Sequence, residues 1–280
     1  MRNIAVETIR DTVASLCQEA NFYLGEDVRR ALSQANVQEE SGLGKNILAQ
    51  LLENADIAKD EQVPICQDTG FALVFVEIGQ EVHIVGGELE KAIHEGVAKG
   101  YQEGYLRKSM VSDPLERENT GDNTPAIIHF KVVSGDKLKI TVAPKGGGSE
   151  NMSAIKMLKP SDGWKGARDF VVSTVQQAGS NPCPPIVVGV GIGGTFEKAA
   201  ILAKESLLRD LGSPNADPNT AKLEKELLNE INKLGIGPQG LGGRTTALAV
   251  HINTFPTHIA SLPVAVNINC HATRHKQAIL

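Results

Sequence analysis

The stretch PPIVVGVGIGGTFEKA (184–199) contains two successive signals of secondary structure. Its first half is a short apolar run that follows two prolines, which is typical of a buried β-strand. Its second half leads directly into a segment of helical character, expected over 195–211. A buried strand that runs into a helix is a building unit of α/β proteins, so this stretch predicts an α/β fold.

The rest of the chain alternates between the same two kinds of segment. Residues 3–23 have helical spacing, with Ile4, Ile9, Val13 and Leu16 on one face. Further helices are expected over 26–36, 45–60, 88–107, 164–178 and 220–234. Strands are expected over 71–78, 81–85, 126–133, 137–144, 184–191, 245–255 and 258–268, the first four of them as two β-hairpins. The mixture favours one α/β domain with mixed sheets over residues 1–280, without an internal repeat or a linker.

The composition excludes several classes of protein. A chain of 280 residues that is 41% hydrophobic can bury the core of one large domain or two modest ones. Its net charge of −5, without a dense Lys/Arg run, argues against a nucleic-acid partner. We expect no secretory signal and no membrane span, since no run of about 18 apolar residues occurs. Four cysteines are too few for a disulfide framework, so reduced thiols and a cytoplasmic location are expected.

Three glycines of the opening stretch have the spacing of a dinucleotide-binding fingerprint: Gly189, Gly191 and Gly194. That fingerprint requires an acidic residue at the end of a second strand, about 20 residues further on. The chain instead reads ESLLRDLGSPN (205–215), a helix end and a loop, so NAD binding is not expected. We expect these glycines to let the backbone approach a ligand, beside a helix N-terminus that favours negative charge.

Three of the four cysteines share a setting that the fourth lacks. Cys66 and Cys183 lie just before predicted strands, and Cys270 lies just after one, in NINCHATR (267–274). Cys17 instead lies within the first predicted helix, where a free cysteine is commonly a buried core residue. The first three are therefore candidates for one common site.

Three thiolates allow only some metal sites. A structural zinc site requires four closed ligands, so three do not complete it. A [4Fe–4S] cluster also normally takes four cysteines, so three would leave one iron open. An open iron is a Lewis acid that can polarise a hydroxyl or a carboxylate. From the spacing alone, three unrelated buried cysteines remain an equally good interpretation.

Six short motifs follow one another along the chain: PICQDTG (64–70), DNTPA (122–126), KGGGSEN (145–151), NPCPP (181–185), VGVGIGGTFEKA (188–199) and NINCHATR (267–274). Together they resemble the α-type domain of class I fumarate hydratases, over nearly the whole chain. These iron–sulfur hydro-lyases also include L(+)-tartrate dehydratase. The resemblance implies that Cys66, Cys183 and Cys270 hold a [4Fe–4S] cluster with one open iron. It also implies the reversible hydration of fumarate to (S)-malate, a step of the tricarboxylic acid cycle.

The resemblance implies roles for residues around Cys66. Gln67 and Asp68 follow this ligand directly, so both would lie within reach of the open iron. Asp68 could hydrogen-bond the substrate hydroxyl or transfer a proton to it. On sequence alone, an Asx turn in CQDTG is the competing interpretation. Arg107, in YLRKSMVSDPL (105–115), corresponds to a substrate-binding arginine that would clamp a carboxylate; a solvated arginine at a helix end is the alternative.

Other positions follow from the same resemblance. Gly148, in KGGGSEN, corresponds to a residue that lines the substrate pocket. His258, in FPTHIASLP, corresponds to an active-site histidine and is expected at a strand start, where a lone histidine is more often structural. His271 and Arg274 adjoin Cys270 and are interpreted as supporting residues that orient a ligand.

We expect a second polypeptide to complete the site. Cys270 lies ten residues before the last residue, so little sequence follows it to close over a cluster. In the family, a β-type domain supplies further cationic residues and the proposed base. The assigned residues offer one arginine, Arg107, for two substrate carboxylates, and an unpaired buried carboxylate would be costly. We therefore expect a β-type subunit in an α₂β₂ assembly, since two-fold symmetry is common in soluble oligomers.

Two other functions fit the same motifs. L(+)-tartrate dehydratase converts tartrate to oxaloacetate by the same chemistry, on a substrate with one more hydroxyl. The other is a non-catalytic iron–sulfur module for electron transfer or sensing, which would need a fully liganded cluster. The presence of only three candidate cysteines argues against this function.

Overall fold

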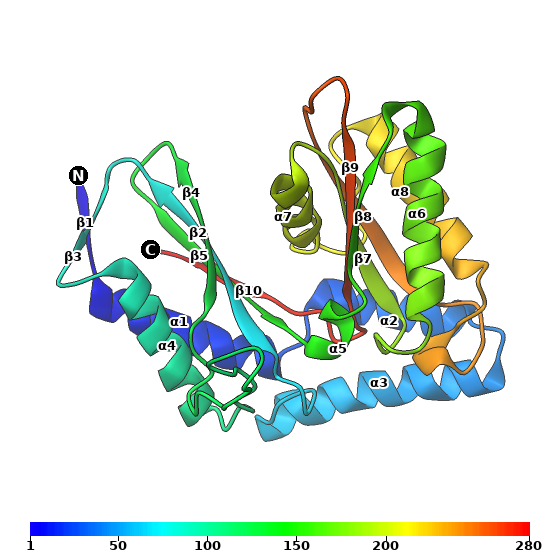
Figure 1. The fold of residues 1–280 in the computed structure, drawn as a ribbon. Helices are drawn as coiled ribbons and strands as arrows, with labels where there is room; N and C mark the ends of the chain where they lie inside the picture. The colour runs from blue at the N-terminus through cyan, green and yellow to red at the C-terminus, as the bar shows by residue number, and fades with distance from the viewer. The chain divides into compact units, whose positions relative to one another are not determined.

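The computed structural model describes residues 1–280 and contains two compact units (Figure 1). Unit 1 comprises Met1–Gly25, Asn54–Gly147 and Arg274–Leu280, and unit 2 comprises Glu26–Glu53 and Gly148–Thr273. Each unit takes segments from distant parts of the sequence, so no single linker divides the chain. The predicted α/β class with mixed sheets is confirmed. That residues 1–280 act as one catalytic domain stays a prediction.

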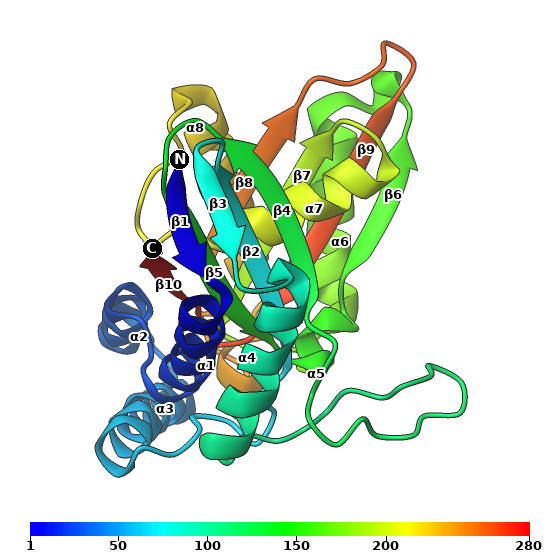
Figure 2. The same ribbon diagram turned by 90° about the vertical axis from the view of Figure 1, so that its left-hand side faces the viewer.

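Unit 1 is built around a four-stranded sheet in the order β10-β5-β2-β4. Its elements are β1 (Arg2–Ala5), α1 (Val6–Phe22), β2 (Phe71–Gly79), β3 (Val82–Val85), α4 (Leu89–Glu103), β4 (Ile127–Val133), β5 (Leu138–Lys145) and β10 (Lys276–Ile279). Alternate residues of a strand point to one face. Val74, Val76 and Ile140 thus form one core with Ile9 of α1 and Ile93 of α4. Figure 2 shows these two helices side by side.

Both predicted hairpins are wrong, although all four strands exist. β3 pairs in parallel with β1, and β2 lies between β4 and β5. β2 takes the centre because Ala72–Val76 are all buried and favour a position with neighbours on both edges. The turn after β4 instead bonds to the end of β2, where the Gly79 N–H donates to the Lys137 oxygen at 2.9 Å. A Cβ at Gly79 would lie 2.3 Å from the Gly135 oxygen, so this contact requires glycine.

Unit 2 contains a second four-stranded sheet, in the order β6-β9-β7-β8. Its elements are α2 (Glu26–Gln38), β6 (Ala154–Leu158), α6 (Gly163–Ala178), β7 (Ile186–Gly193), α7 (Phe196–Ser206), α8 (Pro218–Asn232), β8 (Ala247–Phe255) and β9 (Leu262–Asn269). Val188, Val190 and Val266 form one core with residues of α6 and α8, whereas Ala265 packs with residues of α7. Figure 1 shows α7 on the other side of this sheet from α6 and α8. α3 (Gly42–Glu61) and the short α5 (Gly147–Glu150) have residues in both units.

The glycines of β7 allow α7 to lie directly on the sheet. A Cβ at Gly189 would lie 2.2 Å from the Ala203 oxygen, and one at Gly191 would lie 2.0 Å from the Ala199 oxygen. The expectation that these glycines admit a ligand is therefore wrong for both. They serve the close packing of a helix on a strand.

The predicted helices are confirmed, with shifted ends. Residues 2–5 form strand β1 rather than the start of the first helix, and α7 ends at Ser206 rather than at residue 211. Strands β1, β6 and β10 were not predicted, since each has only four or five residues. None of the helices has the length and apolar character required to cross a membrane.

Candidate functional site

The loop PICQDTG (64–70) leads into β2 in unit 1, and the carboxylate of Asp68 fixes its shape. Asp68 Oδ1 accepts a hydrogen bond from the Gly70 N–H at 2.9 Å, which is the Asx turn that the sequence left open. Asp68 Oδ2 accepts another from the Gly147 N–H, also at 2.9 Å. Cys66 Sγ lies 3.4 Å from the Asp68 nitrogen. The carboxylate therefore joins this loop to the glycine-rich segment that follows β5.

Gln67 extends from the same loop. Its side chain is exposed, and its Oε1 accepts the thiol proton of Cys66 at 3.4 Å. The amide thus lies directly beside the predicted ligand. The position agrees with a group that contacts a molecule bound near Cys66.

Two buried side chains hold this loop from the interior of unit 1. The hydroxyl of Tyr101 lies 2.9 Å from the Thr69 oxygen and 3.0 Å from the Gly70 oxygen, to which it can donate. Burial raises the pKa of Tyr101 well above its ordinary value, so the phenol keeps its proton. Asn123 Nδ2 donates to the Gly70 oxygen at 3.2 Å. The sequence assigned no role to either residue; the only signal was that Asn123 lies in DNTPA.

Arg107 lies in the segment that follows α4, beside the same loop. Thr69 Oγ1 donates to the backbone oxygen of Arg107 at 3.0 Å. Asn123 Oδ1 accepts from the N–H groups of Ser109 and Met110 at 2.7 and 3.2 Å. The backbone of Arg107 is therefore fixed, whereas its side chain is exposed. A guanidinium in this position is available to an anion.

Arg274 reaches the loop from the last segment of unit 1. Its Nη2 donates to the backbone oxygen of Asp68 at 2.6 Å. The residue is only 6% exposed, which is unusual for an arginine. The sequence predicted a supporting role for it next to Cys270, whereas the contact that the structure records is with Asp68.

In unit 2, Cys183 and Cys270 lie at the same end of the sheet. β7 and β9 are antiparallel with Val187 opposite Asn269, so the residues before β7 adjoin the residues after β9. The backbone nitrogen and Nδ1 of His271 lie 3.3 and 3.1 Å from the Cys183 oxygen. The structure thus brings two of the predicted ligands together, with His271 between their loops. Cys66 belongs to unit 1.

Gly148 adjoins the Cys183 loop. A Cβ at this position would lie 3.7 Å from the Asn181 oxygen, which is ordinary van der Waals contact. Gly148 is exposed, so its main chain is accessible. Steric crowding within unit 2 does not require glycine here, so its pocket-lining role stays a prediction.

His258 lies in the exposed loop between β8 and β9, and not at the start of a strand. β9 begins at Leu262, and His258 Nδ1 accepts a hydrogen bond from the Ala260 N–H at 3.1 Å. Cys270 follows the other end of β9, whose eight residues span about 26 Å at ~3.3 Å per residue. The structure therefore does not bring His258 close to Cys270 within unit 2, and its catalytic role stays a prediction.

The four thiols differ in accessibility, and this decides which of them can hold a metal. All four are free. Cys17 is fully buried, as predicted, and burial raises its pKa to about 12, which disfavours the thiolate that binds metal. Cys66 and Cys270 are half-buried and Cys183 is exposed. Three accessible thiols are a donor set that fits an iron–sulfur cluster. Within neither unit do three His, Cys, Asp or Glu side chains form a metal-binding group, so the shared cluster stays a prediction.

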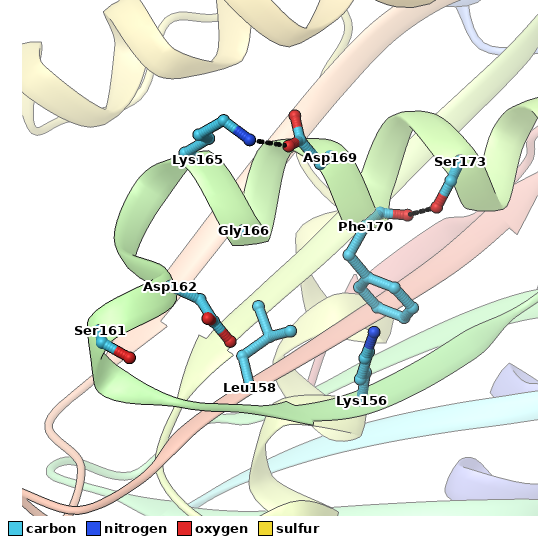
Figure 3. Close-up of a pocket in the computed structure, with 9 residues that line it drawn as sticks. All are labelled: Lys156, Leu158, Ser161, Asp162, Lys165, Gly166, Asp169, Phe170 and Ser173. Carbon is cyan, nitrogen blue, oxygen red and sulfur yellow. Dashed lines mark hydrogen bonds and ion pairs between the residues drawn. The ribbon is translucent and has the colours of Figure 1, made fainter.

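A groove between β6 and α6 of unit 2 is a separate feature (Figure 3). Its wall carries the ion pair Lys165–Asp169, with 2.9 Å between nitrogen and oxygen. The side chain of Lys165 is 80% exposed, so this pair is a solvated one along the outer side of the helix. None of the predicted site residues lines the groove.

Comparisons with known proteins agree over nearly the whole chain. The sequence model of a family described as "Fumarate hydratase (Fumerase)" matches residues 10–279. A protein of Methanocaldococcus jannaschii, named "Putative L(+)-tartrate dehydratase subunit alpha", is 50% identical over 274 residues, which cover 95% of both chains. "L(+)-tartrate dehydratase subunit alpha" of Escherichia coli strain K12 is 34% identical over 274 residues, covering 96% of this chain and 90% of that protein.

Proposed function

The chain belongs to the fumarate hydratase (Fumerase) family of hydro-lyases, and on that premise we propose that it is the α-type subunit of a [4Fe–4S]-dependent enzyme that hydrates fumarate to (S)-malate reversibly. One observation carries this proposal. The three cysteines that the family resemblance assigns to a cluster form no disulfide and are accessible, whereas the remaining one, Cys17, is fully buried.

The cluster would be held by Cys66, Cys183 and Cys270. When bound, it would supply a Lewis acid for the hydroxyl that leaves malate or adds to fumarate. His271 supports the ligand loops, because its ring and its backbone nitrogen both contact the Cys183 oxygen.

Asp68 would orient the substrate hydroxyl. Both of its carboxylate oxygens already accept a backbone N–H, from Gly70 and from Gly147. Each carboxylate oxygen has two acceptor sites, so the carboxylate can still accept a hydrogen bond from a hydroxyl. These two bonds fix the carboxylate in place, which favours a positioning role over that of the base for the adjacent carbon. Gln67 would contact the substrate from the same loop.

Arg107 would bind one carboxylate of the substrate. Its backbone is fixed by Thr69 and its guanidinium is exposed, so it can offer two parallel N–H bonds to an anion. Gly148 would add main-chain contacts. A catalytic role for His258 rests on the family resemblance, and the length of β9 between it and Cys270 weighs against a common site within unit 2.

A β-type subunit would complete the enzyme and supply the base, in an α₂β₂ assembly. The relatives of this chain are named as alpha subunits, which supports a second type of chain. The same names favour L(+)-tartrate as a second candidate substrate. L(+)-tartrate has one hydroxyl more than (S)-malate. A site with a hydrogen-bonding group for that additional hydroxyl would reject malate, which lacks it.

The test is a side-by-side assay of the anaerobically reconstituted chain, with and without a β-type subunit, on fumarate, (S)-malate and L(+)-tartrate. We expect hydration and dehydration only with both subunits, and a higher kcat/KM for malate than for tartrate. The reverse preference would assign the chain to tartrate dehydration. Turnover of none of the three substrates by a cluster-loaded complex would contradict the proposal.

A further inference from the structure

Arg274 is a buried cation without an anionic partner. It is 6% exposed, and its one hydrogen bond runs from Nη2 to the backbone oxygen of Asp68. Its Nε and Nη1 have no hydrogen-bond partner. Nε carries one N–H and Nη1 carries two, so three of the five donors of the guanidinium lack an acceptor.

Arg274 differs in this respect from the two other buried side chains that donate to the loop. The Tyr101 hydroxyl has the Thr69 oxygen as an acceptor, and Asn123 Nδ2 donates to the Gly70 oxygen. Arg209 also has one buried nitrogen without a partner, but its charge is compensated by the Glu224 carboxylate at 2.6 Å. A buried charge that lacks such compensation is strongly unfavourable unless an anion accepts from it.

The position of Arg274 indicates which anion. Its bond to the Asp68 oxygen fixes the guanidinium against the loop that carries Gln67 and Asp68, and it follows Cys270 by four residues. These are the residues that the proposed function places around the substrate. A planar guanidinium matches a planar carboxylate through two parallel N–H bonds.

We propose that Arg274 binds a carboxylate of the four-carbon dicarboxylate substrate, as a second arginine besides Arg107. The inference rests on the proposed function for the identity of the ligand. This chain would then offer a second arginine to the substrate, in addition to the cationic residues expected from the β-type subunit.

The experiment uses succinate, a four-carbon dicarboxylate that has neither a hydroxyl nor a double bond and so cannot react. The full-length ¹⁵N-labelled chain is titrated with succinate before and after cluster reconstitution, and the Nε–H resonance of Arg274 is followed by NMR. The resonance is identified by its loss in Arg274→Lys. We expect it to shift to saturation with succinate.

Affinities of variants provide the second readout, by calorimetry. Arg274→Lys and Arg274→Gln should bind succinate about ten- to hundred-fold more weakly, which corresponds to the loss of charge-assisted hydrogen bonds. Arg10→Gln is the matched control, because Arg10 is a surface cation of the same unit, paired with Asp11 at 2.9 Å. It should bind succinate as the parent does, and circular dichroism verifies that each variant is folded.

Three results would overturn the inference. The first is no succinate binding by the parent, and the second is equal affinity for succinate in folded Arg274→Lys. The third is an Nε–H resonance of Arg274 that shifts when the cluster is reconstituted but does not shift further when succinate is added. Failure of the proposed function is read separately, from the turnover assay. If succinate binding depends on Arg274 but the complex has no hydro-lyase activity, the proposed function is refuted and Arg274 is still a carboxylate-binding residue.

Discussion

Removal of the hydroxyl of Tyr101 tests how the ligand-bearing loop is held. Tyr101→Phe keeps the ring in the core of unit 1, so packing changes little. The change removes the donor that lies between the Thr69 and Gly70 oxygens. Gly70 keeps the bond from Asn123 Nδ2, whereas Thr69 is 1% exposed, so solvent does not readily replace the lost donor at its oxygen. The loop should therefore open more easily, without a change in fold.

The expected change in the free energy of loop opening follows from one buried acceptor, the Thr69 oxygen, that is left without a donor. Such a loss costs ~1–2 kcal/mol in the free energy of local opening. Since about 1.4 kcal/mol is a factor of ten, amide exchange in the loop should accelerate about 5- to 30-fold. Hydrogen–deuterium exchange is the appropriate assay, because unfolding of a chain with two units need not be two-state.

The readout is the exchange of peptides that cover residues 64–72, measured beside peptides from α1. Tyr23→Phe is the matched control: it removes the same atom from a half-buried tyrosine of unit 1, whose hydroxyl donates to Gln62 Oε1 at 2.9 Å. It should leave the loop unchanged. Exchange of 64–72 at the parental rate in Tyr101→Phe, or equal acceleration in α1, would refute the reasoning.

Three further perturbations follow from the contacts. Glu39→Gln should lower the free energy of unfolding by about 1–3 kcal/mol, because its buried carboxylate accepts four backbone N–H groups, including that of Arg244, and the amide would leave at least one of them unpaired. Burial alone would raise the pKa of Glu39, but the backbone hydrogen bonds outweigh burial and lower this pKa below 4.5. The stabilisation by Glu39 should therefore be present above pH 4.5 and be lost as the pH falls through the lowered pKa of the folded state. A difference in unfolding free energy between parent and variant that stays constant across this pH range, measured by urea titration, would contradict the prediction. Gly191→Ala should destabilise unit 2 by several kcal/mol, since its Cβ would overlap the Ala199 oxygen, and a melting temperature equal to the parent's would show that α7 can move. Asp68→Asn should retain the iron content and reduce kcat about 10²–10⁴-fold, whereas turnover within a few-fold of the parent would leave Asp68 as the former of an Asx turn.

The sequence predicted the type of nearly every long element, because periodicity and turn residues are local signals. It did not predict which strands pair. The rule that a short turn joins neighbouring strands placed 126–133 beside 137–144, but the more apolar β2 lies between them. That competition depends on burial across the whole sheet, which no short window of sequence records.

The candidate site was likewise predictable from local motifs but not from long-range contacts. Cys66, Cys183 and Cys270 were identified through motifs and their family resemblance, since their spacing matches no compact metal motif. The role of Tyr101 and the contact of Arg274 with Asp68 were not predicted, because each residue contacts the CQDTG loop from more than thirty residues away. The dinucleotide fingerprint was rejected, but Gly189 and Gly191 were still expected to let the backbone approach a ligand, whereas the structure shows that they allow the close approach of α7.

Iron and acid-labile sulfide per chain, measured after anaerobic reconstitution of the parent and of four cysteine variants, test the central claim most directly. The account predicts a full [4Fe–4S] complement in the parent and in Cys17→Ser, whose thiol is buried in the core. It predicts loss of the brown chromophore and of the iron in Cys66→Ser, Cys183→Ser and Cys270→Ser. A full iron complement in Cys270→Ser, or loss of the cluster in folded Cys17→Ser, would contradict it.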